Sequence, residues 1–239
     1  MNKKYVLLAI LVLMLCMCSI WEYSTISNEA LTEAKVAYIT FDDGPSLITY
    51  EILDILREND VRATFFLVGS KINDETKPLI EQMIADGHQI GVHTFSHDAS
   101  CIYCSADAYY EDVINTASVI NKYVGINPDI YRFPWGSNNA YIMPYREEVI
   151  SRLRDKGLEY CDWNVSGEDS VGKPTASQII SNINANYVKY NQPVILLHDS
   201  ASNEQTAKAL PEIIRMYKEA GYGFATVEER YRICQWSIK

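Results

Sequence analysis

The stretch Thr40-Phe41-Asp42-Asp43-Gly44-Pro45-Ser46 follows a short apolar run, residues 36–39, that is typical of a buried β-strand. Two neighbouring carboxylates therefore stand where a strand gives way to a turn. Like charges this close resist being ionised together, so a metal ion would resolve the conflict, with one Asp as its ligand and the other as a base. The alternative is ordinary turn chemistry, in which Asp caps the turn and Gly-Pro breaks the strand. Residues elsewhere in the chain have to decide between the two.

Short apolar strands alternate with amphipathic helices along the rest of the chain, a pattern typical of α/β proteins with a parallel sheet. We expect a distorted (β/α)7 barrel with a gap, and an open doubly wound sheet is the alternative. Helices are expected over residues 48–59, 105–124, 146–156, 175–190 and 205–220, with a loop after His97 and a last strand at 224–227.

Polar residues at the ends of separate predicted strands favour the barrel. Barrels gather catalytic groups at the carboxyl ends of their strands, whereas an open sheet gathers them mainly at one switch point. The residues concerned are Asp42, Asp43, His93, Arg132, Asp162 and His198.

The composition is that of an ordinary globular protein: 48% of the 239 residues are hydrophobic and 22% are charged. No linker or repeat divides the chain after Lys35, so we expect one catalytic domain over residues 35–232, acting as a monomer. The formal net charge of -10 argues against nucleic acid as a partner, because phosphate binding needs clustered Lys and Arg.

The N-terminal segment, residues 1–25, differs from the rest. Lys3 and Lys4 precede an uncharged apolar run over residues 5–21, which indicates a signal peptide or a membrane anchor. We favour an uncleaved anchor, with a cleaved signal as the alternative. The positive-inside rule then predicts an extracytoplasmic domain, either membrane-anchored or secreted.

Two histidines, in His93-Thr94-Phe95-Ser96-His97, are four positions apart, a spacing that brings both onto one face of a helical turn. With Asp43 they would leave a tetrahedral ion one open position for water, as in catalytic zinc sites. Packed or surface histidines are the alternative for the pair alone.

The alternative for Arg132 is a surface salt bridge. The alternative for Asp162 is an ordinary acidic residue in a turn. Near Asp42, however, Arg132 would orient that carboxylate, and Asp162 beside His198 would hold an imidazolium as the carboxylate of a hydrolytic triad does. His198 ends the apolar run 194–197, and such a strand has no packing reason to end in His-Asp.

Four cysteines lie beyond the N-terminal segment: Cys101, Cys104, Cys161 and Cys234. The first two have metal-knuckle spacing, but no second pair answers them, so no structural zinc site is expected. We expect free thiols, and a local disulfide is the alternative.

Five motifs, taken in order, resemble those of the polysaccharide deacetylases, carbohydrate esterase family four, also called the NodB-type domain. They are TFDDGP at Thr40–Pro45, GHQIGVHTFSH at Gly87–His97, RFPWG at Arg132–Gly136, DWN at Asp162–Asn164 and LLHD at Leu196–Asp199. The resemblance covers about residues 36–231. It implies a distorted (β/α) barrel and a divalent metal held by Asp43, His93 and His97, with zinc expected and cobalt as the alternative.

The same resemblance implies roles for the other residues. Asp42 would be the general base, His198 the general acid, Arg132 the residue orienting Asp42, Asp162 the partner of His198, and the Trp135 N–H the oxyanion donor. Pro134, Trp163 and Leu196 would contact the substrate. Cys101 and Cys104 depart from the family pattern.

The implied activity is hydrolysis of N-acetyl groups on a cell-wall or extracellular glycan, with N-acetylglucosamine of peptidoglycan as the preferred substrate. An acetylxylan O-acetyl esterase or a chitooligosaccharide deacetylase is the alternative. A non-catalytic glycan-binding protein on the same scaffold is the alternative of a different class, and its signature would be loss of a metal ligand or of the acid–base pair.

Overall fold

The computed structural model describes residues 34–230 and 232–236. The chain divides into two compact units, Met1–Lys35 and Val36–Lys239, and every element below belongs to the second. The expected signal or anchor over residues 1–25 lies outside the described residues. Within the described ranges, none of the helices combines the length and apolar character needed to cross a membrane.

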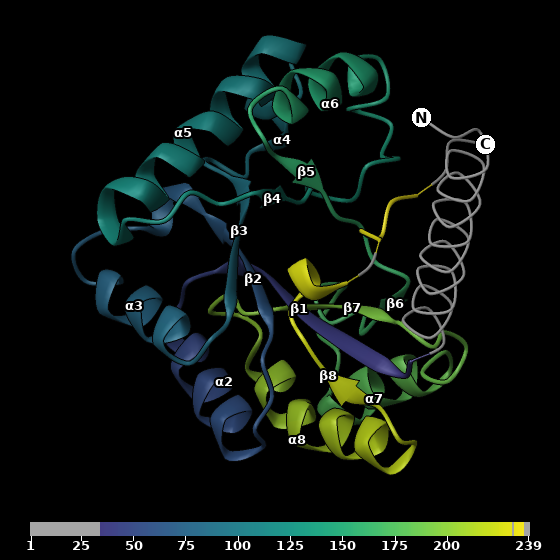
Figure 1. The fold of residues 1–239 in the computed structure, drawn as a ribbon. Coiled ribbons are helices and arrows are strands. Elements are labelled where there is room, and N and C mark those ends of the chain that lie inside the picture. The colour runs from purple at the N-terminus through teal and green to yellow at the C-terminus, as the bar shows by residue number, and fades with distance from the viewer. Residues whose placement is uncertain (1–33, 231, 237–239) are drawn as a thin grey trace, which may run out of the picture. The chain divides into compact units, whose positions relative to one another are not determined.

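Eight strands of the described chain form one sheet in which every pairing is parallel, in the order β5-β4-β3-β2-β1-β7-β6, with β8 paired to β1. The helices lie around the curled sheet (Figure 1). In chain order the elements are β1 Val36–Gly44, α2 Leu47–Glu58, β2 Thr64–Val68, η1 Gly69–Lys71, α3 Lys77–Ala85, β3 Gln89–Thr94, α4 Ala99–Ile102, α5 Ala106–Val124, β4 Ile130–Tyr131, α6 Arg146–Arg154, β5 Glu159–Tyr160, β6 Val165–Ser166, α7 Ala176–Asn184, β7 Val194–His198, α8 Glu204–Glu219, β8 Gly223–Phe224 and η2 Val227–Glu229.

This is the expected α/β barrel with a gap, and several boundaries differ from the expectation. The helix expected to reach residue 190 ends at Asn184, in an Asn-rich run of poor helix formers. The expected loop after His97 contains α4, and the last strand is Gly223–Phe224 rather than 224–227. The two-residue strand β6 is too short to show any periodicity in the sequence.

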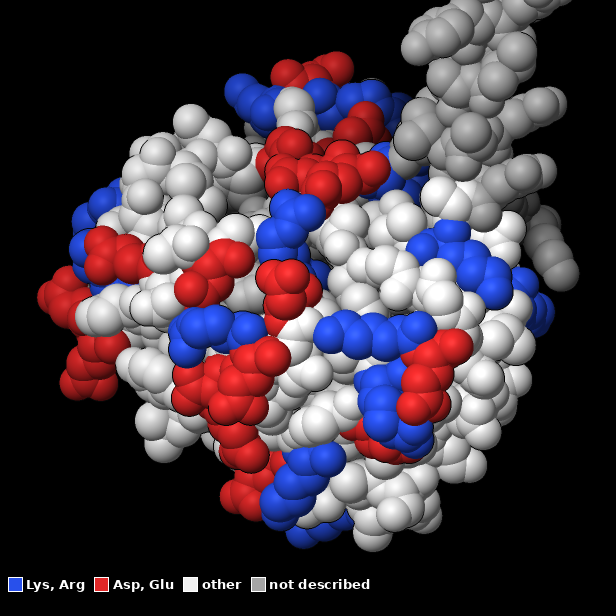
Figure 2. Space-filling view, turned by 60° about the horizontal axis from the view of Figure 1, so that its bottom comes forward, with Lys and Arg blue, Asp and Glu red and all other residues white. Residues whose placement is uncertain are grey.

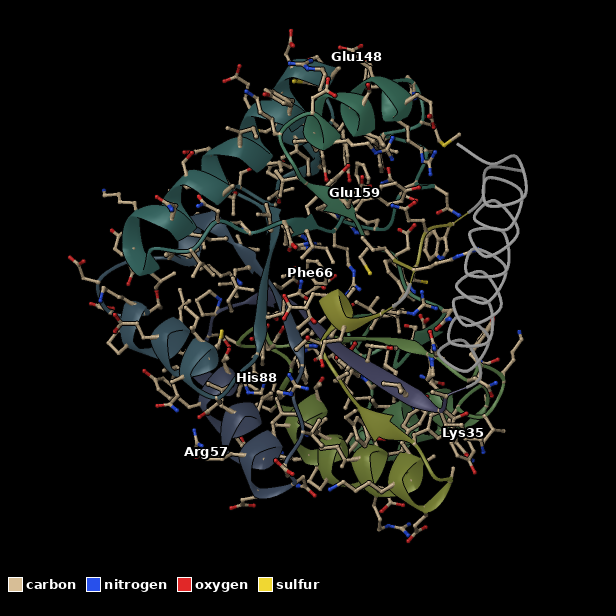
Figure 3. All side chains as sticks on the ribbon, in the orientation of Figure 1. Lys35, Arg57, Phe66, His88, Glu148 and Glu159 are labelled. Atoms are coloured by element: carbon tan, nitrogen blue, oxygen red, sulfur yellow. The ribbon has the colours of Figure 1, made fainter. Side chains whose placement is uncertain are left out.

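Side chains alternate along β1 between two apolar clusters. Ile39 and Phe41 belong to the large cluster that also contains the buried residues of the surrounding helices, whereas Tyr38 belongs to a smaller cluster with Phe66. Figure 3 shows Phe66 near the centre of the curled sheet. Because alternate residues of a strand share a face, Asp42 lies on the same inner side as Tyr38. The inside of the barrel is therefore apolar at its base and carries the acidic group at the strand end.

The gap of the barrel lies between β5 and β6, and residues 161–164 cross it. The C-terminal segment 232–236 runs along this crossing: the Asp162 N–H donates to the Cys234 carbonyl at 2.7 Å, and the Trp236 indole donates to the Trp163 carbonyl at 2.6 Å. The last described residues therefore complete the barrel wall beside the strand ends.

Charged side chains are mostly interleaved on the surface shown in Figure 2, with basic groups beside acidic ones. Arg57, for example, bonds Asp54 and Asp86, each at 2.8 Å. Exposed ion pairs of this kind contribute about 0–1 kcal/mol each. The stability of the fold therefore rests mainly on its two apolar clusters.

Candidate active site

Asp42 and Asp43 both serve one site because the end of β1 is irregular. Adjacent residues of a regular strand point to opposite faces. Here the pairing of β1 with β2 shifts register between Asp42 and Gly44, and Asp43 takes a positive φ of 74°. A bulge of this kind redirects a side chain, and it brings the second carboxylate to the site without moving the first.

Asp43, His93 and His97 form the cluster that could hold a metal, with ligand atoms all within 4.8 Å of one another. Asp43 Oδ1 lies 3.4 Å from His93 Nε2 and 3.2 Å from His97 Nε2. This oxygen is buried and has no hydrogen-bond partner among the described residues. Burial alone would raise the pKa of Asp43, but the neighbouring imidazoles of His93 and His97 hold it well below its usual range.

His93 is fixed by a second contact, from its Nδ1 to the Arg132 carbonyl oxygen at 3.1 Å. With Nδ1 protonated and donating, Nε2 keeps its lone pair and faces Asp43. At His97, burial and then the neighbouring His93 charge lower the pKa. The contact at His93 leaves its Nε2 available as a ligand atom, and the lowered pKa of His97 favours the neutral imidazole that binds metal ions.

The prediction that His93 and His97 share a helical turn is wrong. His93 lies in β3, and the chain then bends through Thr94 and His97, which have φ values of 144° and 52°. The two rings nevertheless come together, with centroids 5.0 Å apart.

A carboxylate from helix α5 holds this bend. Asp112 accepts hydrogen bonds from the backbone N–H of Phe95 and, at 3.0 Å, from the hydroxyl of Ser96, while the Ser96 N–H lies 3.3 Å away. Three donors between the two histidines thus converge on one side chain, which is partly buried against the loop it supports.

Replacing Asp112 by Asn should weaken Zn²⁺ binding by about 10–100-fold, the usual cost of losing a group that supports metal ligands. An amide offers one acceptor oxygen where the carboxylate offers two, so the bend loses part of its support. A competition titration against a zinc-binding dye would measure the change. Asp107→Asn on the same helix, whose side chain is 80% exposed, is the matched control; equal affinities in the two variants would contradict the assignment.

Arg132 lies inside the barrel with no exposed surface and is fully bonded. Its Nη1 donates to Asp42 Oδ1 at 2.8 Å and to Thr40 Oγ1 at 2.7 Å, and its Nε donates to the Cys161 carbonyl at 2.9 Å. The guanidinium carbon lies 4.2 Å from the centre of the Phe66 ring. A Cβ atom on Gly91 of β3 would lie 2.7 Å from the Phe66 ring, so the strand has glycine at this position. Arg132 therefore orients Asp42, as expected.

His198 ends β7 on the same inner side, paired in register with Asp42 of β1. Its Nδ1 lies 2.8 Å from Asp169 Oδ1, and its backbone N–H donates to Asp169 Oδ2, also at 2.8 Å. Burial alone would lower the pKa of His198, but the hydrogen bond and charge of Asp169, aided by Asp42 and Asp43, raise it to about 9. The imidazole is thus held protonated with Nε2 free to donate, as a general acid must be.

The predicted pairing of Asp162 with His198 is wrong. Asp162 is buried and accepts from the N–H of Ser137 at 3.0 Å, from the Ser137 hydroxyl at 2.7 Å and from the N–H of Trp236 at 2.9 Å. Its carboxylate therefore links the loop after β4 to the C-terminal segment 232–236 through hydrogen bonds.

Asp169, which the sequence reasoning missed, follows the two-residue strand β6. Thr206 donates to its carboxylate at 2.6 Å, and Asn203 donates to its carbonyl at 3.0 Å. The one available signal was the polar stretch after Val165–Ser166, and that strand is too short to single it out.

The remaining predicted residues lie around this centre. Trp135 has a φ of 61°, its ring is 5.2 Å from that of His97, and its N–H has no acceptor among the described residues, which leaves it available as a donor. Pro134 and Leu196 are buried, and Trp163 packs edge-on against Trp236 at 4.5 Å. Their role as substrate contacts stays a prediction.

Asp199 supports the turn that follows β1. It is fully buried, accepts from the Thr49 hydroxyl at 2.6 Å, and burial raises its pKa to about 7. A Cβ on Gly44 would lie 2.3 Å from this carboxyl group, so only glycine fits there. Beside the turn, a groove of about 730 Å³ runs from Asp43 along the loops that follow β6 and β7.

The four cysteines are free thiols, as expected, with Cys101 and Cys104 exposed and Cys161 buried. Cys161 begins the gap-crossing segment and accepts from the Arg132 guanidinium through its carbonyl and, at 3.8 Å, through its sulfur. Cys234 contacts this segment through its carbonyl, which accepts from the Asp162 N–H.

Comparisons with known proteins agree with this geometry. A family model described as polysaccharide deacetylase matches residues 30–160. The peptidoglycan-N-acetylglucosamine deacetylase of Bacillus cereus is 33% identical over 202 residues, covering 82% of this chain and 71% of that protein.

Solved structures give the same result. The catalytic domain of a peptidoglycan N-acetylglucosamine deacetylase from Eubacterium rectale is 30% identical with a TM-score of 0.78, covering 86% of this chain and 94% of that one. A family 4 acetyl xylan esterase from Clostridium thermocellum, in complex with a cobalt ion, is 31% identical with a TM-score of 0.67, covering 82% and 90%. The chain therefore belongs to the polysaccharide deacetylase family.

Proposed function

We propose that this protein is a metal-dependent hydrolase that removes N-acetyl groups from a cell-envelope glycan. The observation that carries the proposal is the placement of Asp42 and His198 in register on neighbouring strands, next to the cluster of Asp43, His93 and His97. A base and an acid thus face one point beside a three-ligand metal site. All three candidate metal-ligating residues are present, and so are both members of the acid–base pair. This argues against a purely glycan-binding role.

The three ligands fit a divalent metal because the buried Asp43 oxygen has no other partner and the donor set is two imidazoles and one carboxylate. When bound there, such an ion would supply a Lewis acid that lowers the pKa of water and polarises the acetyl carbonyl. We propose Zn²⁺, with Co²⁺ as the alternative that the cobalt-bound relative suggests.

The chain's own residues would act around that centre in order. Asp42, oriented by Arg132, takes a proton from the attacking water. The Trp135 N–H donates to the carbonyl oxygen as it gains negative charge. His198 then gives its proton to the nitrogen as the C–N bond breaks, so that acetate and a free amine leave.

Peptidoglycan N-acetylglucosamine is our proposed substrate. The relatives named as peptidoglycan deacetylases support it, and so does the lysine-flanked apolar segment over residues 1–25, which would place the domain outside the cell as an anchored or secreted monomer. The second candidate is acetylxylan, because a relative of similar identity is an acetyl xylan esterase.

Acetate release from peptidoglycan, chitooligosaccharide and acetylxylan, measured with and without added Zn²⁺, tests the proposal. We expect release from N-acetylated glycans, loss of it after treatment with a chelator, and recovery when Zn²⁺ is added back. Release from acetylxylan alone would identify an O-acetyl esterase instead. Binding of a glycan without any release by the metal-loaded protein would identify a binding module.

A further inference from the structure

Three aromatic residues beside the candidate active site pack on one another, and we call them the aromatic shelf: Trp135 and Tyr141, which are exposed, and Tyr103, which is buried and contacts both rings. The Tyr141 ring is 62% exposed and Trp135 is 51% exposed, although each is large and apolar. Tyr141 stacks on Tyr103 with a 10° angle between the rings and 6.0 Å between their centroids. Tyr103 stacks in turn on the fully buried Tyr109 at 5.5 Å, so the exposed ring tops a column rooted in helix α5.

The shelf is held in place by hydrogen bonds rather than by apolar packing alone. The Tyr103 hydroxyl donates to the Pro134 carbonyl at 2.8 Å. Asn139 donates from its side-chain amide to the Pro134 and Gly136 carbonyls at 3.1 and 2.7 Å, and its amide oxygen accepts from the Tyr141 N–H at 2.9 Å. The loop that carries Trp135 and Tyr141 is therefore preorganised before any ligand arrives.

The shelf continues directly from the metal ligands. The His97 ring lies 5.2 Å from Trp135, and Trp135 lies 6.1 Å from Tyr103. These residues follow β3 and β4, whereas the 730 Å³ groove is built by the loops after β6 and β7 and reaches Asp43. In the sheet order, β1 and β2 separate the two regions. The metal cluster thus stands between the aromatic shelf and a polar groove.

We propose that the aromatic shelf binds a sugar ring of the substrate chain next to the sugar that is deacetylated, with Tyr141 as its contact surface. The proposal rests on the proposed function, since it adds a binding subsite for a longer glycan. A β-linked pyranose presents a flat face of C–H groups that matches an exposed aromatic ring, and its hydroxyls stay in water. A protein partner would need a larger apolar patch than the exposed side chains of this loop offer, which are Trp135, Tyr141 and Met143.

The test compares wild type with Tyr141→Ala and Tyr141→Phe on N-acetylglucosamine oligomers of increasing length. Both acetate-release kinetics and binding by calorimetry are measured on the metal-loaded protein. We expect Tyr141→Ala to raise KM and Kd for the longest oligomer by about 2–10-fold, the usual worth of one ring contact, with kcat unchanged. The shortest oligomer, which does not reach the shelf, should show no change, and Tyr141→Phe should behave as wild type. Val188→Ala, which alters another exposed apolar side chain outside the shelf, is the control.

Equal KM and Kd values for the Ala variant and wild type on every oligomer would overturn the shelf, as would wild-type protein that binds no oligomer. If wild type binds the oligomers without releasing acetate and Tyr141→Ala weakens that binding, the result supports the sugar-binding role of the shelf and contradicts the proposed function.

Discussion

Replacing Asp42 by Asn should slow acetate release by about 10²–10⁴-fold, the range that a general base usually contributes, without loss of bound metal. The amide keeps the shape of the side chain but cannot accept the proton. No neighbouring carboxylate can take over, because Asp43 faces the two imidazoles, Asp169 is engaged by His198 and Asp199 is buried against Thr49. Single-turnover rates and zinc stoichiometry of the variant are the measurements.

The same substitution leaves the buried Arg132 guanidinium without its carboxylate, and breaking a buried pair typically costs about 3–5 kcal/mol of unfolding free energy. Thermal unfolding must therefore be followed alongside activity, at a temperature where the variant is folded. A folded, metal-loaded Asp42→Asn protein with a rate within a few-fold of wild type would rule out Asp42 as the base.

Asp169→Asn should slow the reaction by about 10²–10⁴-fold and move the basic limb of the pH–rate profile to lower pH. His198 must be protonated to act as the acid, so activity falls as pH rises through its pKa, which is about 9 with Asp169 in place. Burial lowers the pKa of His198 and the Asp169 charge raises it, so removing that charge lets the pKa fall. The measurement is kcat/KM against pH, and the shift between variant and wild type is the quantity compared.

Asp162→Asn is the matched comparison, since this residue also lies near the strand ends and is fully buried. Its carboxylate bonds Ser137 and Trp236, so the variant should lose about 2–4 kcal/mol of unfolding free energy and keep the basic limb in place. A shifted limb in Asp162→Asn with an unshifted one in Asp169→Asn would restore the pairing that the sequence predicted.

The sequence predicted the site where residues stand directly at the ends of long or strongly apolar strands. Asp42 after residues 36–39 and His198 after residues 194–197 are the clearest cases, because a buried run that ends in a titratable group has no packing explanation. Parallel strands then bring such ends together, as the register of Asp42 with His198 shows.

The sequence could not predict contacts that depend on backbone irregularity or on distant partners. The bulge at Asp43 and the bend before His97 involve positive φ values in non-glycine residues, and no local pattern encodes them. Asp162 was given the wrong partner because its real partners, Ser137 and Trp236, lie 25 residues before it and 74 residues after it in irregular segments. Asp169 follows a strand of two residues, which leaves no periodic signal.

Because β1 lies between β2 and β7 in the sheet, one of its neighbours is synthesised long before the other. Thr40 of β1 bonds Ile195 of β7 across 155 residues of chain. At a synthesis rate of roughly 5–20 residues per second, the first strand waits about 10–30 s for that neighbour. By then the three proposed metal ligands, the last of which is His97, have long been made, whereas His198, the proposed acid, has not. A nascent chain can therefore hold the ligands for an ion well before it can hold the acid, and no fragment that stops short of β7 can complete the proposed reaction.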